Sequence, residues 1–442
     1  MALSSDLIGQ RSETVRRANL STILRELHLA GPLSRSDLVA HSGLTRTGIK
    51  SLTAELAAAG LVSEERASPD GSPGRPSAVV SPNPTTAAVL ALEVAVDSIA
   101  AAVVGLGGTV HQLTRIDRPP GHSSIEATVA DLVGLARTVR IQSGLPDAIV
   151  GVGVAVVGTT RRSDGFVSFA PNLGWHDVSL GNRLAAALGL PEPIAVANDA
   201  DLGVLAEHRR GAAIGADNVL LIWGEVGIGG GLIIDGRPMT GAAGYGGEVG
   251  HIPVNADGRP CQCGSVGCWE TEIGEGALLL RAGRSADGGR EEVEQVLAEA
   301  AAGSPAALAA LDDVGRWLGF GLAGLVNVLN PQLVVLGGLF GRAYQYAAQA
   351  MLTELERRAL PASRSMVQIV PATLGINAPL LGAAELAFEP LLADPAAWMV
   401  RSAFAPDARR RPPSRTTPPP VIPYPLNPIP LARARKEVHR HH

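Results

Sequence analysis

The chain has very little cysteine: only Cys261, Cys263 and Cys268 among its 442 residues. Because all three fall in one short segment, the sequence excludes a disulfide scaffold and fits a reducing cytoplasm. The first thirteen residues are polar and lack the apolar core of a signal peptide, and no run approaches the roughly 18 apolar residues that cross a bilayer. We therefore expect a cytoplasmic protein without a membrane partner.

The chain also lacks a strong excess of either charge, since its net charge at pH 7 is −5. This value argues against a basic coat over the whole protein, but a small basic surface on one domain would not appear in the sum. The length predicts two or three domains, and 46% apolar residues are enough for their cores.

A histidine precedes the cysteines in the pattern H-x9-C-x-C-x4-C. Three thiolates and one imidazole are the ligand set of a closed tetrahedral zinc site. We therefore predict one structural zinc ion bound by His251, Cys261, Cys263 and Cys268. The alternative is a chance cluster of small buried thiols.

A turn-rich stretch rich in proline and glycine, from Ser68 to Pro84, separates a helical pattern from a strand pattern. It predicts an N-terminal domain over residues 1–82 and a larger domain over 83–394. The last segment, 395–442, is basic and rich in proline, a composition that cannot bury enough surface to fold, so we predict a disordered tail.

The N-terminal domain has the pattern of a winged helix-turn-helix. Asn19–His28 has apolar residues at helical spacing, Ser34 and Asp37 form a capping box for a second helix, and a turn at Gly43 leads to a third helix capped by Thr45. A helix in this position reads bases in the major groove. The predicted DNA contacts are Arg46, Thr47, Lys50 and Ser51 on the third helix and Arg75 in the wing. The alternative is a three-helix module that binds another protein.

From about residue 87 onward, strands alternate with helices, which predicts an α/β fold with ligand chemistry at the strand ends. The expected strands are 89–94, 99–106, 109–116, 148–157, 194–197, 218–223, 231–234 and 332–336. The expected helices are 124–140, one that follows Asp199 through Glu207, and 306–329. The chain length favours two lobes with a cleft between them.

Several motifs resemble the ROK family, which is named for repressors, open reading frames and sugar kinases. The resemblance covers about residues 87–392. It implies two actin-like (ribonuclease H-like) lobes that bind a sugar, and an N-terminal helix-turn-helix is the arrangement of the family's repressors. The motifs are Asn172–Trp175, Asn198–Ala200, Gly246–Pro253, Cys261–Glu270 and Asn330–Gly338.

A buried sugar needs amides, carboxylates and an imidazole to pair its hydroxyls. The candidate sugar contacts are Asn172, Asn198, Asp199, Glu248, His251 and Glu270. The resemblance implies that Asp199 stands in the place of a kinase's general base, and that His251 directs one nitrogen to zinc and the other to the sugar. The alternative for the carboxylates is solvated loop charge.

The phosphate-binding turns expected of a kinase of this family are altered. Its first turn, Asp-x-Gly-Gly-Thr-Lys, is here Glu93–Ser98, which lacks both glycines and carries Asp97. The second turn carries an added acid, Glu225, and Val226 in place of threonine. Like charges about 4 Å apart cost roughly 4 kcal/mol at an effective dielectric of 20, so two acids here disfavour ATP.

These observations predict a sugar-responsive DNA-binding repressor with no enzymatic activity. Its expected partners are a double-stranded operator, a sugar or sugar-phosphate effector, and further copies of itself in a homodimer or homotetramer. One alternative is a sugar kinase with an added DNA-binding domain. A second is a DNA-binding scaffold that recognises a protein in place of a sugar.

Overall fold

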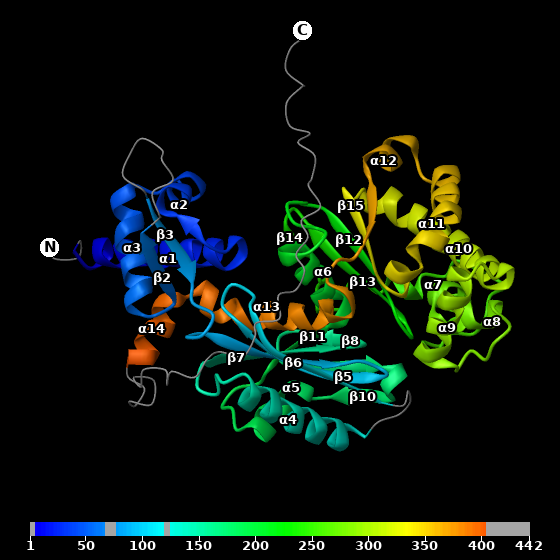
Figure 1. The fold of residues 1–442 in the computed structure, drawn as a ribbon, viewed down its shortest axis with the longest axis horizontal. Helices are drawn as coiled ribbons and strands as arrows, with labels where there is room; N and C mark the ends of the chain where they lie inside the picture. The colour runs from blue at the N-terminus through cyan, green and yellow to red at the C-terminus, as the bar shows by residue number, and fades with distance from the viewer. Residues whose placement is uncertain (1–4, 67–76, 119–123, 404–442) are drawn as a thin grey trace, which may run out of the picture.

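The computed structural model describes residues 5–66, 77–118 and 124–403, and consists of an N-terminal unit docked on two α/β lobes (Figure 1). The N-terminal unit contains three helices and a three-stranded sheet of order β1-β3-β2. Its elements are α1 (Ser5–Ala30), β1 (Leu33–Ser34), α2 (Arg35–Ser42), α3 (Arg46–Ala58), β2 (Val62–Arg66) and β3 (Ala78–Pro82).

The local signals of this unit act as the sequence predicts. Ser34 and Asp37 form the capping box of α2, and Gly43 ends this helix with a φ of 70°, a left-handed conformation that glycine adopts without steric cost. The Thr45 side chain accepts the Gly48 N–H and begins α3. Helix α1 is longer than the predicted 19–28. The wing residue Arg75 lies outside the described residues.

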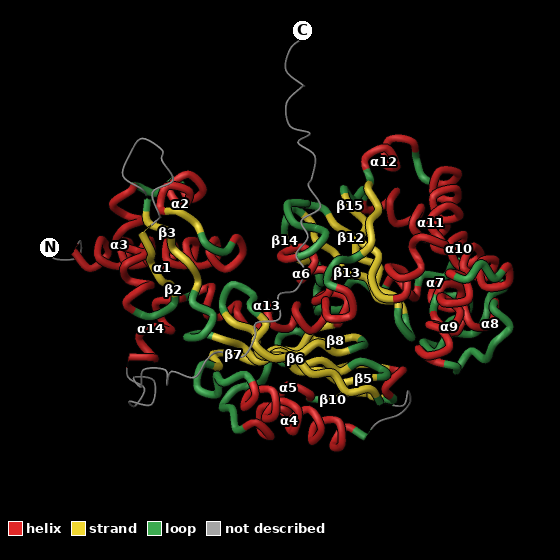
Figure 2. Tube along the Cα trace, in the orientation of Figure 1, coloured by secondary structure: helices red, strands yellow, loops and turns green. Residues whose placement is uncertain are grey.

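Each lobe is built on a five-stranded mixed sheet, and the two sheets have the same strand order and directions. The strands of both sheets are yellow in Figure 2. In each, a three-stranded antiparallel meander is extended by two parallel strands on the side of its first strand. In lobe 1 the order is β6 (Val110–Asp117), β5 (Ser98–Gly105), β4 (Ala88–Val94), β7 (Ile149–Val156) and β11 (Ala195–Asn198). In lobe 2 it is β14 (Arg237–Pro238), β13 (Ile228–Ile234), β12 (Val219–Gly224), β15 (Leu333–Gly338) and β16 (Gln368–Pro371).

Helices cover both sheets. Lobe 1 carries α4 (Ile125–Gln142), α5 (Leu180–Leu188) and a small sheet of β8 (Thr159–Arg161), β9 (Phe166–Ala170) and β10 (Trp175–Val178). Lobe 2 carries α7 (Trp269–Ile273), α8 (Glu275–Arg281), α9 (Gly289–Ala301), α10 (Pro305–Leu329), α11 (Leu339–Arg358) and α12 (Pro361–Met366). The predicted strands and long helices of this region agree with the structure to within a few residues.

Two helices, α6 (Asp199–Arg210) and α13 (Ala378–Ala393), form a layer between the two sheets (Figure 1). Helix α13 packs closely on lobe 1, because a Cβ added at Gly153 of β7 would lie 2.2 Å from the Ala383 carbonyl oxygen. Helix α6 packs as closely on lobe 2, where a Cβ added at Gly231 of β13 would lie 2.3 Å from the Ala200 carbonyl oxygen. The sheets therefore contact each other through this helix pair.

The prediction of a disordered tail from residue 395 is wrong for residues 395–403. Pro395–Ala403 form helix α14, and Trp398 is 8% exposed in the core that also contains Leu20 and Leu24 of α1. Proline is well suited to the first turn of a helix, where no backbone hydrogen bond is lost, so the proline-rich composition concealed this helix. Residues 404–442 lie outside the described residues. Among the helices that the structure describes, none combines the length and apolar character of a membrane span.

Candidate functional site

A pocket opens between the lobes at the carboxyl ends of β4, β7, β11 and β12. This is where α/β sheets present ligand-binding loops, because each strand releases its chain there into a turn. The structure brings all six predicted sugar contacts to this pocket: Asn172, Asn198, Asp199, Glu248, His251 and Glu270. Trp223, near the end of β12, also lines the pocket, although no motif in the sequence marks it as a ligand contact.

Asn198 and Asp199 begin helix α6 in the floor of the pocket. Asn198 Oδ1 accepts the backbone N–H groups of Ala200 (2.8 Å) and Asp201 (3.2 Å), and its Nδ2 donates to the Gly158 carbonyl (3.0 Å). The amide is therefore mainly a helix cap, and only one N–H of the predicted sugar contact remains for a ligand.

Asp199 is half-buried in the pocket. The pKa of Asp199 is raised to about 7, mainly by burial. The hydrogen bond that the Ala200 N–H donates to the carboxylate lowers the pKa, whereas the carboxylates of Glu93 and Glu248 raise it. A carboxyl group with this pKa exchanges a proton near neutral pH, and can either donate or accept a hydrogen bond from a hydroxyl group.

Glu248, His251 and Glu270 form the opposite wall. Thr159 Oγ1 donates to Glu248 Oε1 across the cleft (3.3 Å). His251 lies between the two acids, with Nε2 4.0 Å from Glu248 Oε2 and Nδ1 3.7 Å from Glu270 Oε1. Burial raises the pKa of Glu248, and the His251 imidazole opposes the shift. The wall thus offers one ring nitrogen and two carboxylates to the pocket.

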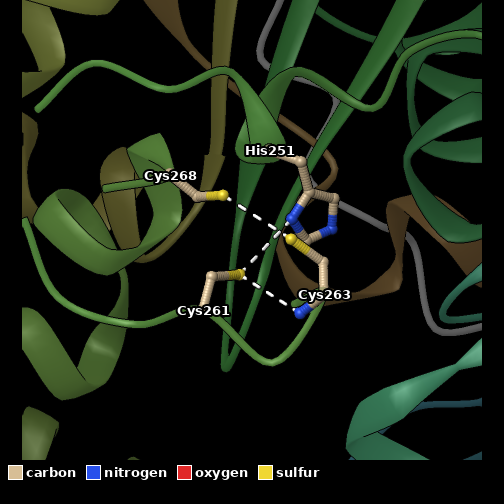
Figure 3. Close-up of side chains that lie close together, drawn as sticks. All are labelled: His251, Cys261, Cys263 and Cys268. Atoms are coloured by element: carbon tan, nitrogen blue, oxygen red, sulfur yellow. Dashed lines mark hydrogen bonds between the residues drawn. The ribbon is translucent and has the colours of Figure 1, made fainter. Parts of the chain in front are cut away.

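The predicted zinc ligands come together behind this wall (Figure 3). The candidate ligand atoms of His251, Cys261, Cys263 and Cys268 all lie within 4.8 Å of one another. The sulfur atoms of Cys263 and Cys268 are 3.6 Å apart, and Cys261 Sγ is 3.6 Å from His251 Nδ1. Zinc–sulfur bonds of about 2.3 Å in a tetrahedron separate two sulfurs by about 3.8 Å, so the cluster has the size and chemistry of a zinc site.

The cluster also orients His251. Its Nδ1 faces Cys261 and its Nε2 faces the pocket side, toward Glu248. The Cys261 thiol donates to Glu270 Oε1 over 2.9 Å. A zinc ion would take the place of the thiol proton and so free this carboxylate oxygen for another partner.

At the other end of the pocket, the two altered turns carry ion pairs. Asp97 receives two hydrogen bonds from Arg290 of α9, from Nε (2.8 Å) and Nη2 (3.1 Å). Arg290 Nη2 is also 3.5 Å from Glu225 Oε2, and Arg342 of α11 approaches the same oxygen (3.8 Å). Burial raises the pKa of Glu225 to about 7, although both arginines oppose the shift.

These arginines correct one expectation. The argument from like charges counted only the acids Asp97 and Glu225, and in the structure each of them has a guanidinium partner. Asp97 belongs to lobe 1 and Arg290 to lobe 2, so the bidentate pair also links the lobes. No local pattern in the sequence indicates that Arg290 pairs with Asp97, because the two residues are 193 positions apart.

The predicted DNA contacts lie together on one face of α3. Arg46, Thr47, Lys50 and Ser51 are all exposed, whereas the opposite face buries Ile49, Leu52, Thr53 and Leu56. The helix therefore presents a continuous polar surface on its first two turns.

Comparison with known proteins identifies the family. The ROK family model matches residues 89–389, more than half of the chain. The chain belongs to the ROK family. A xylose repressor of Bacillus spizizenii is 28% identical over 384 residues, which are 86% of this chain and 97% of that protein. A glucokinase of Streptomyces coelicolor is 31% identical over 309 residues, which are 66% of this chain and 95% of that protein.

A solved structure of a ROK family transcriptional regulator, described as a homologue of the E. coli Mlc protein, has a TM-score of 0.70 and 26% identity. The match covers 87% of this chain and 98% of that structure. The ROK lobes therefore have the expected sugar-kinase-like α/β fold. The matches to the xylose repressor and to this regulator both cover a larger share of the chain than the glucokinase match does.

Proposed function

We propose that this ROK protein is a transcriptional repressor that responds to a sugar and controls genes of carbohydrate metabolism. The observation that carries the proposal is the combination, in one chain, of a helix with an exposed polar face and a pocket lined by sugar-type hydrogen-bonding groups. The similarity to the xylose repressor over 86% of the chain supports the same function.

The N-terminal unit would act as a winged helix-turn-helix. Helices α2 and α3 meet at the Gly43 turn, and the hairpin of β2 and β3 would carry the wing. Arg46, Thr47, Lys50 and Ser51 are at the N-terminal end of α3, which is the end that contacts base edges in this class. A two-fold dimer would present two copies of α3 to a palindromic operator.

The pocket favours an uncharged sugar over a sugar phosphate. Five carboxylates line it, those of Asp97, Asp199, Glu225, Glu248 and Glu270, and no lysine or arginine is among its lining residues. The nearby Arg290 and Arg342 already form ion pairs with acids, Arg290 with Asp97 and Arg342 with Glu294. A phosphate would add two negative charges to this surface, whereas hydroxyl groups can donate to the carboxylates.

A structural zinc ion is part of this proposal. Held by His251 and the three cysteines, it would fix the His251 tautomer and the loop that leads to Glu270, and supply no chemistry of its own. The residues of this chain would then bind the hydroxyl groups: Asp199 from the floor, and Glu248, His251 and Glu270 from the wall.

The second candidate function is a sugar kinase, which the similarity to glucokinases favours. The ion pairs between Asp97, Arg290 and Glu225 argue against it, because they occupy the two turns on which a ROK kinase would hold phosphates. A kinase would have to break these pairs to admit ATP.

One experiment tests the function. The purified chain selects an operator from random duplexes, and fluorescence anisotropy then follows this complex with D-xylose, D-glucose and D-glucose 6-phosphate. We expect a neutral sugar to release the DNA and the phosphate ester to have no effect. Release by no sugar would refute the sensor, and ATP turnover that depends on sugar would favour the kinase.

A further inference from the structure

Helix α6 connects the pocket to the N-terminal unit. Its first residues, including Asp199, line the pocket, and its last turn carries Arg209 and Arg210. The twelve residues of α6, at 1.5 Å each, span about 18 Å. One buried helix therefore reaches from the pocket to the N-terminal unit.

At the far end of α6, four side chains form what we call the α1 junction: His28 of α1, Arg209 and Arg210 of α6, and Glu385 of α13. Arg209 Nη1 donates to Glu385 Oε2 (3.0 Å), and Arg210 Nε donates to Glu385 Oε1. His28 is fully buried and its Nε2 lies 3.1 Å from Glu385 Oε2. Arg210 Nη1 also donates to the Gly107 carbonyl (3.1 Å), so the junction reaches lobe 1.

Hydrogen bonds and burial set the charges in the junction. His28 Nδ1 accepts the Gly107 N–H (3.0 Å), and His28 Nε2 lies 3.1 Å from Glu385 Oε2 and 2.7 Å from Arg210 Nη2. Burial lowers the pKa of His28, so the ring is neutral. Burial opposes ionisation of Glu385, but Arg210 and His28 hold its pKa well below the usual range. A buried carboxylate with two guanidinium partners tolerates little displacement, since losing one partner leaves buried charge unpaired.

A rim of ion pairs extends the junction along α1. Arg25 donates two hydrogen bonds to Glu389 of α13, at 2.8 and 3.3 Å, and Arg209 Nη2 contacts the same carboxylate. Near the middle of α1, Arg16 Nε donates to Glu55 of α3 (3.2 Å). Helix α1 therefore contacts both the helix layer between the lobes and the predicted recognition helix.

This arrangement makes α1 sensitive to the angle between the lobes. Helix α13 is packed on the lobe 1 sheet and α6 on the lobe 2 sheet, and the two helices touch where a Cβ added at Gly382 would lie 2.0 Å from the Leu202 carbonyl oxygen. The junction joins the end of α6 to α13 and to α1. A change in lobe angle moves α6 relative to α13, and the junction must move or break.

We infer that Arg209, Arg210, Glu385 and His28 are the coupling residues of the repressor, which transmit sugar binding at the start of α6 to the position of α1 and α3. The inference rests on the proposed function and adds the route of its regulation. In this inference the junction is the element whose arrangement both the sugar and the DNA would bias.

The test measures coupling apart from binding. The coupling factor is the ratio of operator dissociation constants with and without saturating sugar, and typical allosteric proteins give about 5–150-fold. The variants are Arg210→Gln and, at the half-exposed rim where folding is less at risk, Arg25→Gln. Arg25→Lys tests rescue, and Arg183→Gln is the control, since it removes an exposed ion pair with Glu126 between α5 and α4.

We expect the factor to fall toward one in Arg25→Gln and Arg210→Gln, to recover partly in Arg25→Lys and to be unchanged in Arg183→Gln, while calorimetric affinity for D-xylose or D-glucose persists. A wild-type factor in both glutamine variants would overturn the inference and leave the proposed function intact. If no sugar binds, the proposed function fails. The coupling is then measured in the opposite direction, from the DNA to the pocket, by hydrogen exchange. Operator binding should then change protection of the Ala200 and Asp201 amides in the wild type and not in Arg210→Gln, and equal changes in both would overturn the inference.

Discussion

Replacing Asp199 with asparagine should make the protein more stable at neutral and alkaline pH. The carboxyl group is buried beside Glu93 and Glu248, and its pKa is raised from an ordinary value of 3.8 to about 7. Between these two values the folded state holds a proton that the unfolded state has lost. The free energy of unfolding therefore falls as pH rises through this window, by at most about 4 kcal/mol for three pH units.

Asparagine has nearly the same shape and keeps the oxygen that accepts the Ala200 N–H (3.0 Å), but it cannot lose a proton. From pH 5.5 to pH 8.0, Asp199→Asn should therefore gain about 2 kcal/mol of unfolding free energy relative to the wild type, because about 1.5 units of the window lie above pH 5.5. Urea unfolding followed by tryptophan fluorescence at both pH values measures the difference.

Asp201, two positions after Asp199 in α6, provides a matched control. Burial also raises the pKa of Asp201 to about 7, but this residue does not line the pocket. Both asparagine variants should be stabilised at pH 8.0, and only Asp199→Asn should weaken sugar binding, by up to about tenfold for one lost hydrogen bond. If the unfolding free energy of Asp199→Asn had the same pH dependence as that of the wild type, the reasoning from burial would be refuted. Equal sugar affinity in both variants would show that Asp199 does not contact the sugar.

Three further predictions concern the metal, the DNA and the lobe contact. Elemental analysis should find one zinc per chain and none in Cys263→Ser, and a folded, sugar-binding wild type without zinc would contradict the assignment. Lys50→Ala and Arg46→Ala should each weaken operator binding by about 1–3 kcal/mol with unchanged sugar affinity, and if both had no effect, base recognition would not lie on α3. Arg290→Ala should lower the unfolding free energy by about 2 kcal/mol, between the values for exposed and buried ion pairs, as its side chain is 27% exposed. Arg284→Ala removes ion pairs within lobe 2 alone and should lower the unfolding free energy by less, as measured by urea unfolding. Equal decreases in the two variants would argue against a special role for the contact between the lobes.

The sequence was most informative where the signal is local. The zinc pattern places four ligands within 18 residues, so a short loop is enough to bring His251 and Cys268 together. The caps at Ser34 and Thr45 begin helices by bonding to amides three residues away. Asn198 and Asp199 could be placed in the pocket because they lie where strand β11 ends and helix α6 begins.

Contacts between distant segments could not be predicted in this way. Arg290 meets Asp97 across 193 residues, and neither has a neighbour that marks it as paired. Many arginines could have served, and only the packing of α9 against the lobe 1 turn selects this one. Helix α14 was missed for a different reason: its first residue, Pro395, reads as the start of a proline-rich tail, although Trp398 and Met399 gave an apolar signal.

The α1 junction also has a consequence for how the protein is made. His28 and Glu385 are 357 residues apart, so the N-terminal unit leaves the ribosome long before the partner of its buried histidine has been synthesised. At about 5–20 residues per second, the interval is about 20 to 70 s. During that time the predicted DNA-binding helices have no sensor to dock on. A chain whose synthesis stops early would carry these helices without the junction through which we infer that the sugar controls them.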